Sequence, residues 1–187
     1  MGFQTVNHSN ITPPKGSNLL RQTYDKVESL DGVQILKTNT FSDDFGGWFK
    51  ETIRLDEEGR SQALKEIGID FKPIQANMSY LAPHTERFWH IHPTQNEIWT
   101  TNGTILLGLI DYRTGSKTYG KKMKIVLSSE KLVYIPFGVA HGFINPSITP
   151  VTLNYFTDQH FQANEKTQEY RIDPENLSYD FVKPEIM

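Results

Sequence analysis

The sequence contains no cysteine. Disulfide bonds, thiolate metal ligands and a cysteine nucleophile are therefore excluded, and the redox compartment is left undetermined. Long apolar runs are missing too, because none approaches the ~20 residues that a membrane-spanning helix requires. The N-terminus lacks the basic and then apolar pattern of a secretion signal. These absences predict a cytoplasmic protein with no membrane partner.

Positive charge is not in excess either. Nineteen Lys and Arg stand against 22 Asp and Glu, for a net charge of −3. Such a chain has no general attraction to nucleic acid, so we expect no nucleic-acid partner, and any anionic ligand must be held by local groups. The length of 187 residues predicts one domain over 1–187. Residues 1–20 are rich in Asn, Ser, Thr and Pro and predict an irregular arm, and the polar residues 160–187 predict a tail.

Most of the chain has the pattern of short strands separated by turn residues. Strands that recur at this spacing predict an all-β fold, a jelly-roll sandwich or barrel with short helical segments. The best helix candidate is 61–67, with Ser61 as N-cap and Gly68 as the stop. The predicted strands are 33–38, 48–54, 75–81, 87–92, 97–101, 104–112, 121–127, 131–135, 143–145 and 151–156.

One residue separates His90 from His92 in a segment of aromatic and β-branched residues. Side-chain direction repeats every two residues in a strand, so both imidazoles face the same side. Glu97 follows after one bend, and His141 lies in a later segment that begins with a turn. Three imidazoles and one carboxylate suit a divalent metal such as Zn, Fe, Mn or Ni. They could equally frame an acid–base site without metal. No organic cofactor is indicated.

These residues fall in two motifs that resemble those of the cupin superfamily. The first is His-x-His with a following Glu and Gly, which here covers His90–Glu97 and Gly103. The second, Pro-x-Gly-x-x-His-x-x-x-Asn, is complete over Pro136–Asn145. The first motif departs slightly, because Glu97 to Gly103 is one residue shorter than usual and the expected preceding Gly is His84.

The flanking residues narrow the resemblance. In order and spacing, residues 40–160 resemble the dTDP-4-dehydrorhamnose 3,5-epimerase family. The resemblance implies a dimeric jelly-roll cupin that inverts C3 and C5 of a 4-keto-6-deoxy sugar bound to a nucleoside diphosphate. The matching segments are Gly47–Glu51, Gln75–Tyr80, Arg87–His90, Asp111–Gly120 and Ile135–Phe143.

The same resemblance implies roles for particular residues. His90 corresponds to the catalytic base and Tyr155 to the catalytic tyrosine. It also implies a homodimer in which residues 40–54 add to the partner's sheet and seal an exposed edge. The implied substrate-binding residues are Phe49 and Glu51 at the nucleotide and partner edge, Gln75 and Asn77 on the nucleotide, Arg87 on the phosphate side, and His141.

The sequence also departs from the family pattern. Gly46 and Asn96 stand where the family has an arginine and a lysine. Charge-assisted bonds dominate phosphate recognition, so their loss predicts weaker nucleotide binding. The late acidic residue that pairs with the base has no recognisable counterpart in the sequence. Conversely, His92 and Glu97 are not part of the family pattern, and they complete a possible metal tetrad with His90 and His141.

Three functions are compatible with this pattern. The first is a keto-sugar epimerase that removes a proton α to a carbonyl, with His90 as base and Tyr155 as acid. The second is a metal-dependent cupin isomerase, lyase or oxygenase in which His90, His92, Glu97 and His141 are the ligands. The third is a non-catalytic sugar-binding cupin. Tyr155 has an alternative interpretation as a core residue of a buried strand.

Overall fold

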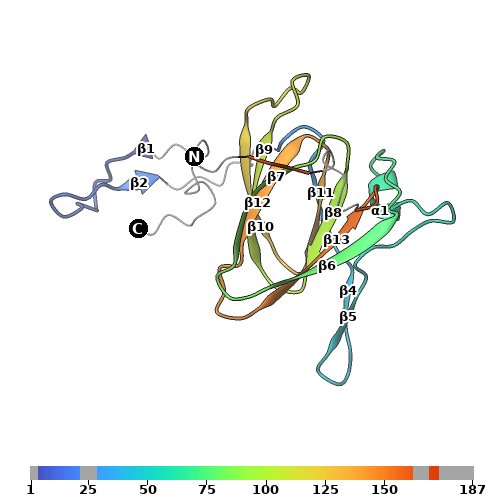
Figure 1. Cartoon of the computed structure of the whole chain (residues 1–187). Coiled ribbons are helices and arrows are strands. Elements are labelled where there is room, and N and C mark those ends of the chain that lie inside the picture. Colours follow the sequence, from blue (N-terminus) through green and yellow to red (C-terminus); the bar gives the residue numbers. More distant parts are fainter. Residues whose placement is uncertain (1–3, 22–28, 162–168, 173–187) are drawn as a thin grey trace.

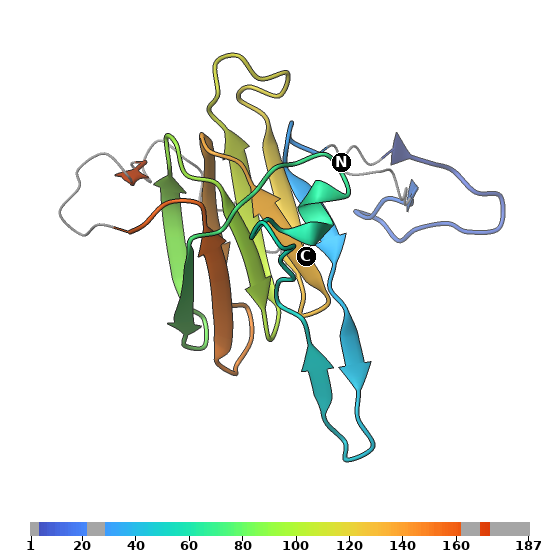
Figure 2. The same cartoon turned by 90° about the vertical axis from the view of Figure 1, so that its right-hand side faces the viewer.

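A computed structural model describes residues 4–21, 29–161 and 169–172. Two five-stranded antiparallel sheets face each other and enclose the core (Figures 1 and 2). This arrangement confirms the all-β jelly roll. In spatial order, the first sheet consists of β10 (Lys122–Leu127), β9 (Ile105–Asp111), β12 (Val139–Ile144), β7 (Glu86–Ile91) and β14 (Tyr170–Arg171). The second consists of β3 (Gln34–Lys37), β11 (Lys131–Ile135), β8 (Glu97–Thr101), β13 (Val151–Thr157) and β6 (Gln75–Leu81).

Two pairs of short strands and one helix of the described residues lie outside the two sheets. β1 (Gln4–Thr5) and β2 (Leu20–Arg21) pair with each other in the N-terminal arm, which is apart from the sheets in Figure 1. β4 (Thr40–Ser42) and β5 (Trp48–Lys50) form a hairpin that projects beyond the sheets (Figure 2). The helix α1 (Gln62–Lys65) packs Leu64 against the outside of the second sheet.

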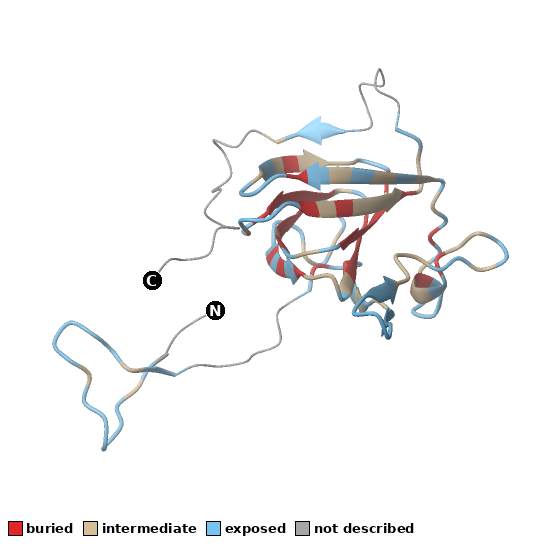
Figure 3. Cartoon of the chain, turned by 90° about the horizontal axis from the view of Figure 1, so that it is seen from below, coloured by how far each residue is buried: buried red, intermediate tan, exposed pale blue. Residues whose placement is uncertain are grey.

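The core follows from alternation of apolar and polar residues along the strands. In β10, Met123, Ile125 and Leu127 are buried while the residues between them are exposed. Such a two-residue period turns one side of each strand inward. The buried residues of both sheets meet in the interior (Figure 3). Each fully buried Leu or Ile contributes about 1.5–3 kcal/mol to stability, so this layer holds the two sheets together.

The predicted strands are largely confirmed, with differences at turns. The strands 75–81, 97–101 and 131–135 have the predicted bounds. β12 begins at Val139 and not at residue 143, because Gly138 at φ 70° completes the preceding turn within one residue. The strand predicted over 48–54 ends at Lys50. The helix is shorter than 61–67, and Ser61 occupies the N-cap position without a side-chain capping bond.

Part of the predicted tail over 160–187 forms a short strand. Tyr170 and Arg171 form β14, which pairs with His90 and Ile91 of β7. Most of the remaining tail lies outside the described residues. Among the residues that the structure describes, no helix is long and apolar enough to cross a membrane.

A buried carboxylate organises the loop after β9. Asp111 is 1% exposed and accepts hydrogen bonds from Arg113 Nε at 2.9 Å and from Thr118 Oγ1 at 2.7 Å. Burial by itself would raise the pKa of the Asp111 carboxyl, but the hydrogen bonds from Arg113, Ser116 and Thr118 outweigh it and hold the pKa below the ordinary range. The carboxylate is therefore stabilised in its charged form in the folded state.

We expect Asp111→Asn to lower the free energy of unfolding by about 2–4 kcal/mol, because Arg113 keeps its charge and loses its partner. Because the folded-state pKa is lowered, this stabilisation is present above the unfolded-state pKa of about 3.9 and is lost as pH falls through the folded-state value. Urea unfolding of both proteins between pH 7 and pH 3 would measure it. The exposed Asp70→Asn is the control, and equal losses in both variants would contradict the argument.

Candidate active site

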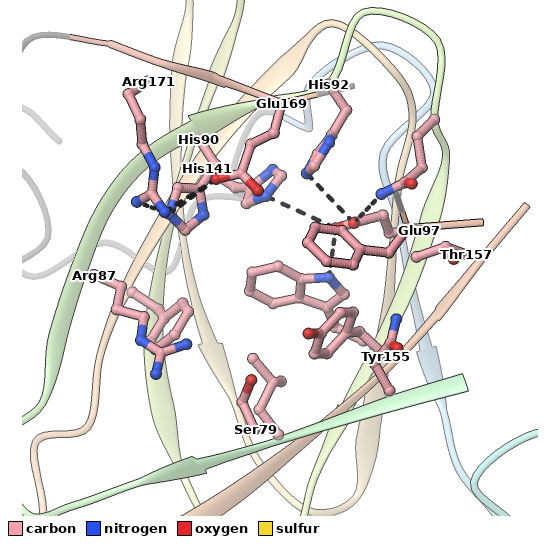
Figure 4. Close-up of a pocket in the computed structure, with 16 residues that line it drawn as sticks. Ser79, Arg87, His90, His92, Glu97, His141, Tyr155, Thr157, Glu169 and Arg171 are labelled. Carbon is pink, nitrogen blue, oxygen red and sulfur yellow. Dashed lines mark hydrogen bonds and ion pairs between the residues drawn. The ribbon is translucent and has the colours of Figure 1, made fainter. Parts of the chain in front are cut away.

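Two rows of side chains, one from each sheet, face one cavity. In the first sheet Arg171, His90 and His141 are neighbours across β14, β7 and β12. In the second sheet Asn77, Tyr155 and Trp99 are neighbours across β6, β13 and β8. The cavity has a volume of about 420 Å³, within the usual range for small-molecule sites, and all six residues line it. Figure 4 shows His90 and Tyr155 on different walls.

A β-bulge in β7 decides which residues reach the cavity. His141 pairs with His90, but Phe143 pairs with Arg87, so one extra residue of β7 lies between the two pairs. Without the bulge, Arg87 would face away from His90, because side chains alternate along a strand. With it, Arg87 joins His90 on the cavity wall. Gly142 lies opposite the bulge, where an added Cβ would be 2.4 Å from Cδ1 of Phe88.

Three of the four predicted metal ligands converge. Ligand atoms of His92, Glu97 and His141 all lie within 4.8 Å of one another. The Nε2 atom of His92 is 3.5 Å from Oε1 of Glu97, and that of His141 is 3.7 Å from Oε2. His90 is not one of this group, although its ring centroid is 5.7 Å from that of His141. The predicted tetrad is therefore a group of three with His90 beside it.

Neighbours fix the carboxylate of Glu97 from both sides. Gln95 Nε2 donates to Oε1 at 2.7 Å, and the indole Nε1 of Trp99 donates to Oε2 at 2.7 Å. The Glu97 side chain is almost entirely buried. The Trp99 ring also packs edge-on against His141, with centroids 4.9 Å apart. These contacts leave the carboxylate one orientation, with both oxygens facing the imidazoles.

The buried imidazole of His141 is neutral at neutral pH. Burial lowers the pKa of His141 to about 4, against a smaller opposite effect of Glu97. The Nδ1 atom of His141 lies 3.2 Å from the carbonyl oxygen of Val139, which can only accept, so Nδ1 carries the proton. The lone pair of His141 therefore lies on Nε2, the atom that faces Glu97.

Two charged residues of the tail, Glu169 and Arg171, lie beside His90. Burial, and then the proximity of His141 and Arg171, lower the pKa of His90 to about 3. The guanidinium of Arg171 contacts Nε2 of His90, so this nitrogen is the acceptor. Glu169 lies 4.0 Å from the same atom and 3.0 Å from Arg171. The sequence offered no recognisable acidic partner for the base, and the structure places Glu169 beside it.

The comparisons with known proteins agree with this geometry. The family model described as dTDP-4-dehydrorhamnose 3,5-epimerase matches residues 28–186. The chain belongs to this family. The spore coat polysaccharide biosynthesis protein SpsL of Bacillus subtilis is 32% identical over 157 residues, which cover 81% of this chain and 96% of SpsL. A dTDP-4-dehydrorhamnose 3,5-epimerase of Sinorhizobium fredii is 30% identical, and the match covers 69% of this chain and 66% of that protein.

Solved structures place the fold in the same family. The dTDP-4-dehydrorhamnose 3,5-epimerase from Sulfolobus tokodaii is 27% identical with a TM-score of 0.65, covering 86% of each chain. ChmJ, a 3'-monoepimerase from Streptomyces bikiniensis solved with dTDP-quinovose, is 21% identical with a TM-score of 0.69, covering 86% of this chain and 79% of ChmJ. Membership in this epimerase family favours an enzyme over a non-catalytic sugar-binding cupin.

Some residues that the family resemblance implied do not reach the cavity within one chain. Phe49 lies on the projecting hairpin and is 62% exposed, and Glu51 pairs with Arg54 just after that hairpin. Gln75 does not line the cavity itself, but its amide donates to Asn77 at 2.7 Å. The expected roles of Phe49 and Glu51 require a second subunit.

The two missing cations also have a structural explanation. Gly46 has φ 83° in the tip of the hairpin, a conformation that favours glycine. The side-chain amide nitrogen of Asn96 donates a hydrogen bond to Oδ2 of Asp158 at 2.6 Å. The amide oxygen of Asn96 accepts one from the backbone N–H of Phe137 at 3.0 Å. Asn96 ties three loops together and is not among the residues that line the cavity. Arg171 adds a cation that sequence reasoning missed, because its pairing with β7 leaves no signal in a polar tail.

Proposed function

We propose that this protein epimerises a keto-sugar linked to a nucleoside diphosphate, by removing a proton α to the carbonyl and returning one on the other face. Family membership supports the reaction class, and one observation supports the mechanism: His90 and Tyr155 stand on different sheets across a shared cavity. Inversion needs a proton acceptor on one face and a donor on the other, which is what two opposed walls supply. Such a biosynthetic enzyme is expected to work in the cytoplasm.

His90 is assigned as the base. Its imidazole is neutral in the free protein and its Nε2 carries the lone pair. After proton transfer, the imidazolium faces Glu169 at 4.0 Å, and an opposite charge at that distance stabilises it. Arg171 occupies Nε2 before the substrate arrives. It must turn away, and the diphosphate is a group to which a guanidinium binds with two parallel bonds.

Tyr155 is assigned as the acid. Its ring lies beside Trp99, with centroids 6.5 Å apart, and between Asn77 and Trp99 in the row of the second sheet. The ring packs against the core while its face remains part of the cavity lining. A tyrosine so placed combines both interpretations of the sequence: the ring fills the sheet interior, and the hydroxyl serves as a proton donor.

Turnover in deuterium oxide tests this function. The protein is incubated with a dTDP-linked 4-keto-6-deoxyhexose, and nuclear magnetic resonance follows deuterium at C3 and C5. We expect exchange together with formation of the inverted sugar. Exchange at C3 alone would make the protein a 3-epimerase, the type of reaction named for ChmJ. No exchange at either carbon would rule out the proposed reaction on this substrate.

Binding of dTDP should depend on a small number of positively charged side chains. Among the described residues that line the cavity, Arg87 and Arg171 carry fixed positive charge. A charge-assisted bond contributes about 1.5–3 kcal/mol, so we expect Arg87→Gln to weaken dTDP binding by roughly 10–100-fold. Calorimetric titration would measure this, with the exposed Lys15→Gln in the arm as control. A sub-micromolar dissociation constant that Arg87→Gln leaves unchanged would show that other groups hold the pyrophosphate.

The projecting hairpin supports a homodimer. Phe41, Phe45, Trp48 and Phe49 are each more than half exposed, and Phe45 is 99% exposed. β6 stands at the edge of the second sheet, so its outer side can accept a strand from a second copy. Residues 40–54 of one subunit on the sheet of the other would cover these aromatics and bring Phe49 and Glu51 to the partner's cavity.

We expect light scattering at micromolar concentration to give twice the mass of one chain, and Phe45→Asp with Trp48→Asp to shift the protein to a monomer. Two buried charges in an apolar interface cost several kcal/mol. The control is Ile148→Asp, an 83% exposed residue in a different loop. A wild-type monomer, or a double variant that stays dimeric, would rule out this interface.

A further inference from the structure

We propose that His92, Glu97 and His141 bind one divalent transition-metal ion beside the catalytic base. The ligand atoms of all three lie within 4.8 Å of one another at the wall of the cavity (Figure 4). Two histidines and one carboxylate on one side of an ion leave its other positions open for water or substrate. This site goes beyond the epimerase reaction proposed above, because metal binding can be measured without any sugar.

The spacing suits a common ion. Imidazole nitrogen and carboxylate oxygen bind zinc at about 2.0–2.2 Å, so two ligand atoms of one ion are at most about 4.4 Å apart. The separations of Glu97 from His92 and from His141, 3.5 Å and 3.7 Å, already meet this limit. The third separation, bounded at 4.8 Å, needs a movement on the order of 1 Å or less to meet it.

Two of the three donor groups are also held as metal ligands commonly are. A metal-binding histidine commonly donates its other ring N–H to a backbone carbonyl, which fixes the tautomer. His141 does so through Nδ1 to Val139 and turns Nε2 to the site. Ligating carboxylates are held in turn by hydrogen bonds. Glu97 is held by Gln95 and Trp99, one at each oxygen.

A group of three joined only by hydrogen bonds explains the geometry less well. Charge-assisted N–H···O bonds are about 2.7–2.9 Å long, whereas the two imidazole nitrogens stand 3.5 Å and 3.7 Å from Glu97. A cation between the three groups also compensates a carboxylate that is only 3% exposed.

The site is separate from His90, whose Nε2 faces Arg171 and Glu169. The base therefore keeps its lone pair, and an ion held by His92, Glu97 and His141 would supply a Lewis acid in the same cavity. The Lewis-acid role rests on the proposed epimerase function, whereas binding of an ion to the site is independent of that function.

Direct titration tests the site. The full chain, purified without a nickel column and dialysed against EDTA, is titrated with Zn²⁺ in a calorimeter and with Co²⁺ under visible absorption. We expect one equivalent of each ion. His92→Gln and Glu97→Gln, which are close in shape to the native residues, should weaken binding by more than 100-fold. Trp99→Phe, which removes the hydrogen bond to Glu97, should weaken it by about 10–100-fold.

Two matched variants serve as controls. His90→Gln should keep wild-type affinity, which separates the group of three from the tetrad predicted from the sequence. His8→Gln, in the exposed arm, should keep it as well. Circular dichroism confirms that each variant is folded. If Zn²⁺ binds wild type no more tightly than Glu97→Gln, the metal site is wrong, and this outcome leaves the epimerase assay untouched. Loss of binding in His90→Gln would restore the tetrad.

Discussion

Replacement of His90 by glutamine is expected to lower kcat by about 10²–10⁴-fold, the usual contribution of a general base. Glutamine keeps the size and polarity of the side chain but cannot accept the α proton. Arg171 in β14 and Glu169, which precedes β14 and pairs with Arg171, keep their own contacts. Turnover of the dTDP-linked keto-sugar and the rate of deuterium incorporation should therefore fall together.

Tyr155→Phe is the informative companion. His90 still removes the proton from its own wall, so we expect exchange of deuterium into unreacted substrate to persist while the amount of inverted product falls.

His92→Gln distinguishes the two enzymatic hypotheses. Activity changes little if His92 is only a wall residue of the cavity, and both metal binding and activity are lost if it is a metal ligand. Exchange at the wild-type rate in His90→Gln would assign the base to another residue.

Gly142→Ala is expected to lower the free energy of unfolding by about 3 kcal/mol, the upper part of the range for overpacking. The new methyl group would be 2.4 Å from Cδ1 of Phe88 and 3.1 Å from the carbonyl oxygen of Arg87. Phe88 must move, and the β-bulge that turns Arg87 to the cavity moves with it. At 2–4 °C per kcal/mol for a chain of this size, Tm should fall by roughly 6–12 °C.

The affinity for dTDP should fall in the same variant, because Arg87 loses its position. The double variant Gly142→Ala with Phe88→Leu should be less destabilised than the two single changes together, since the smaller side chain gives space to the methyl group. Gly115→Ala is the matched control, because no atom lies within 4 Å of its added Cβ. Additive effects of Gly142→Ala and Phe88→Leu would contradict the proposed contact.

Most of the barrel could be predicted from local pattern. A two-residue period with turn residues between strands gives the strand positions, because burial of alternate side chains needs little information from distant residues. The spacing of His90 and His92 and the motif around His141 likewise place three imidazoles at one cavity. Family resemblance, not spacing, supplied the role of Tyr155, which the structure places opposite His90.

The remaining features depend on contacts between distant segments. The single-residue spacing of His90 and His92 suggested equivalent ligands, but Arg171 and Glu169 draw Nε2 of His90 toward β14. A two-residue strand such as β14 is too short to have a recognisable alternation of apolar and polar residues, and it depends on pairing with β7. The bulge beside Gly142 is equally invisible, since an extra residue in one strand is defined only by the register of its partner.

Because β14 pairs with β7 over only two residues, a change in this part of the chain can alter catalysis while the two sheets still fold normally. Tyr170 and Arg171 pair with β7 in two positions, whereas the other strands of the two sheets are four to seven residues long. The groups that surround His90 are thus attached to a part of the chain on which barrel folding depends little. An affinity tag or reporter fused at the C-terminus therefore risks altering catalysis in a protein whose spectrum and melting curve remain normal. A fusion at the N-terminal arm, far from His90 along the chain, is the safer design for assays.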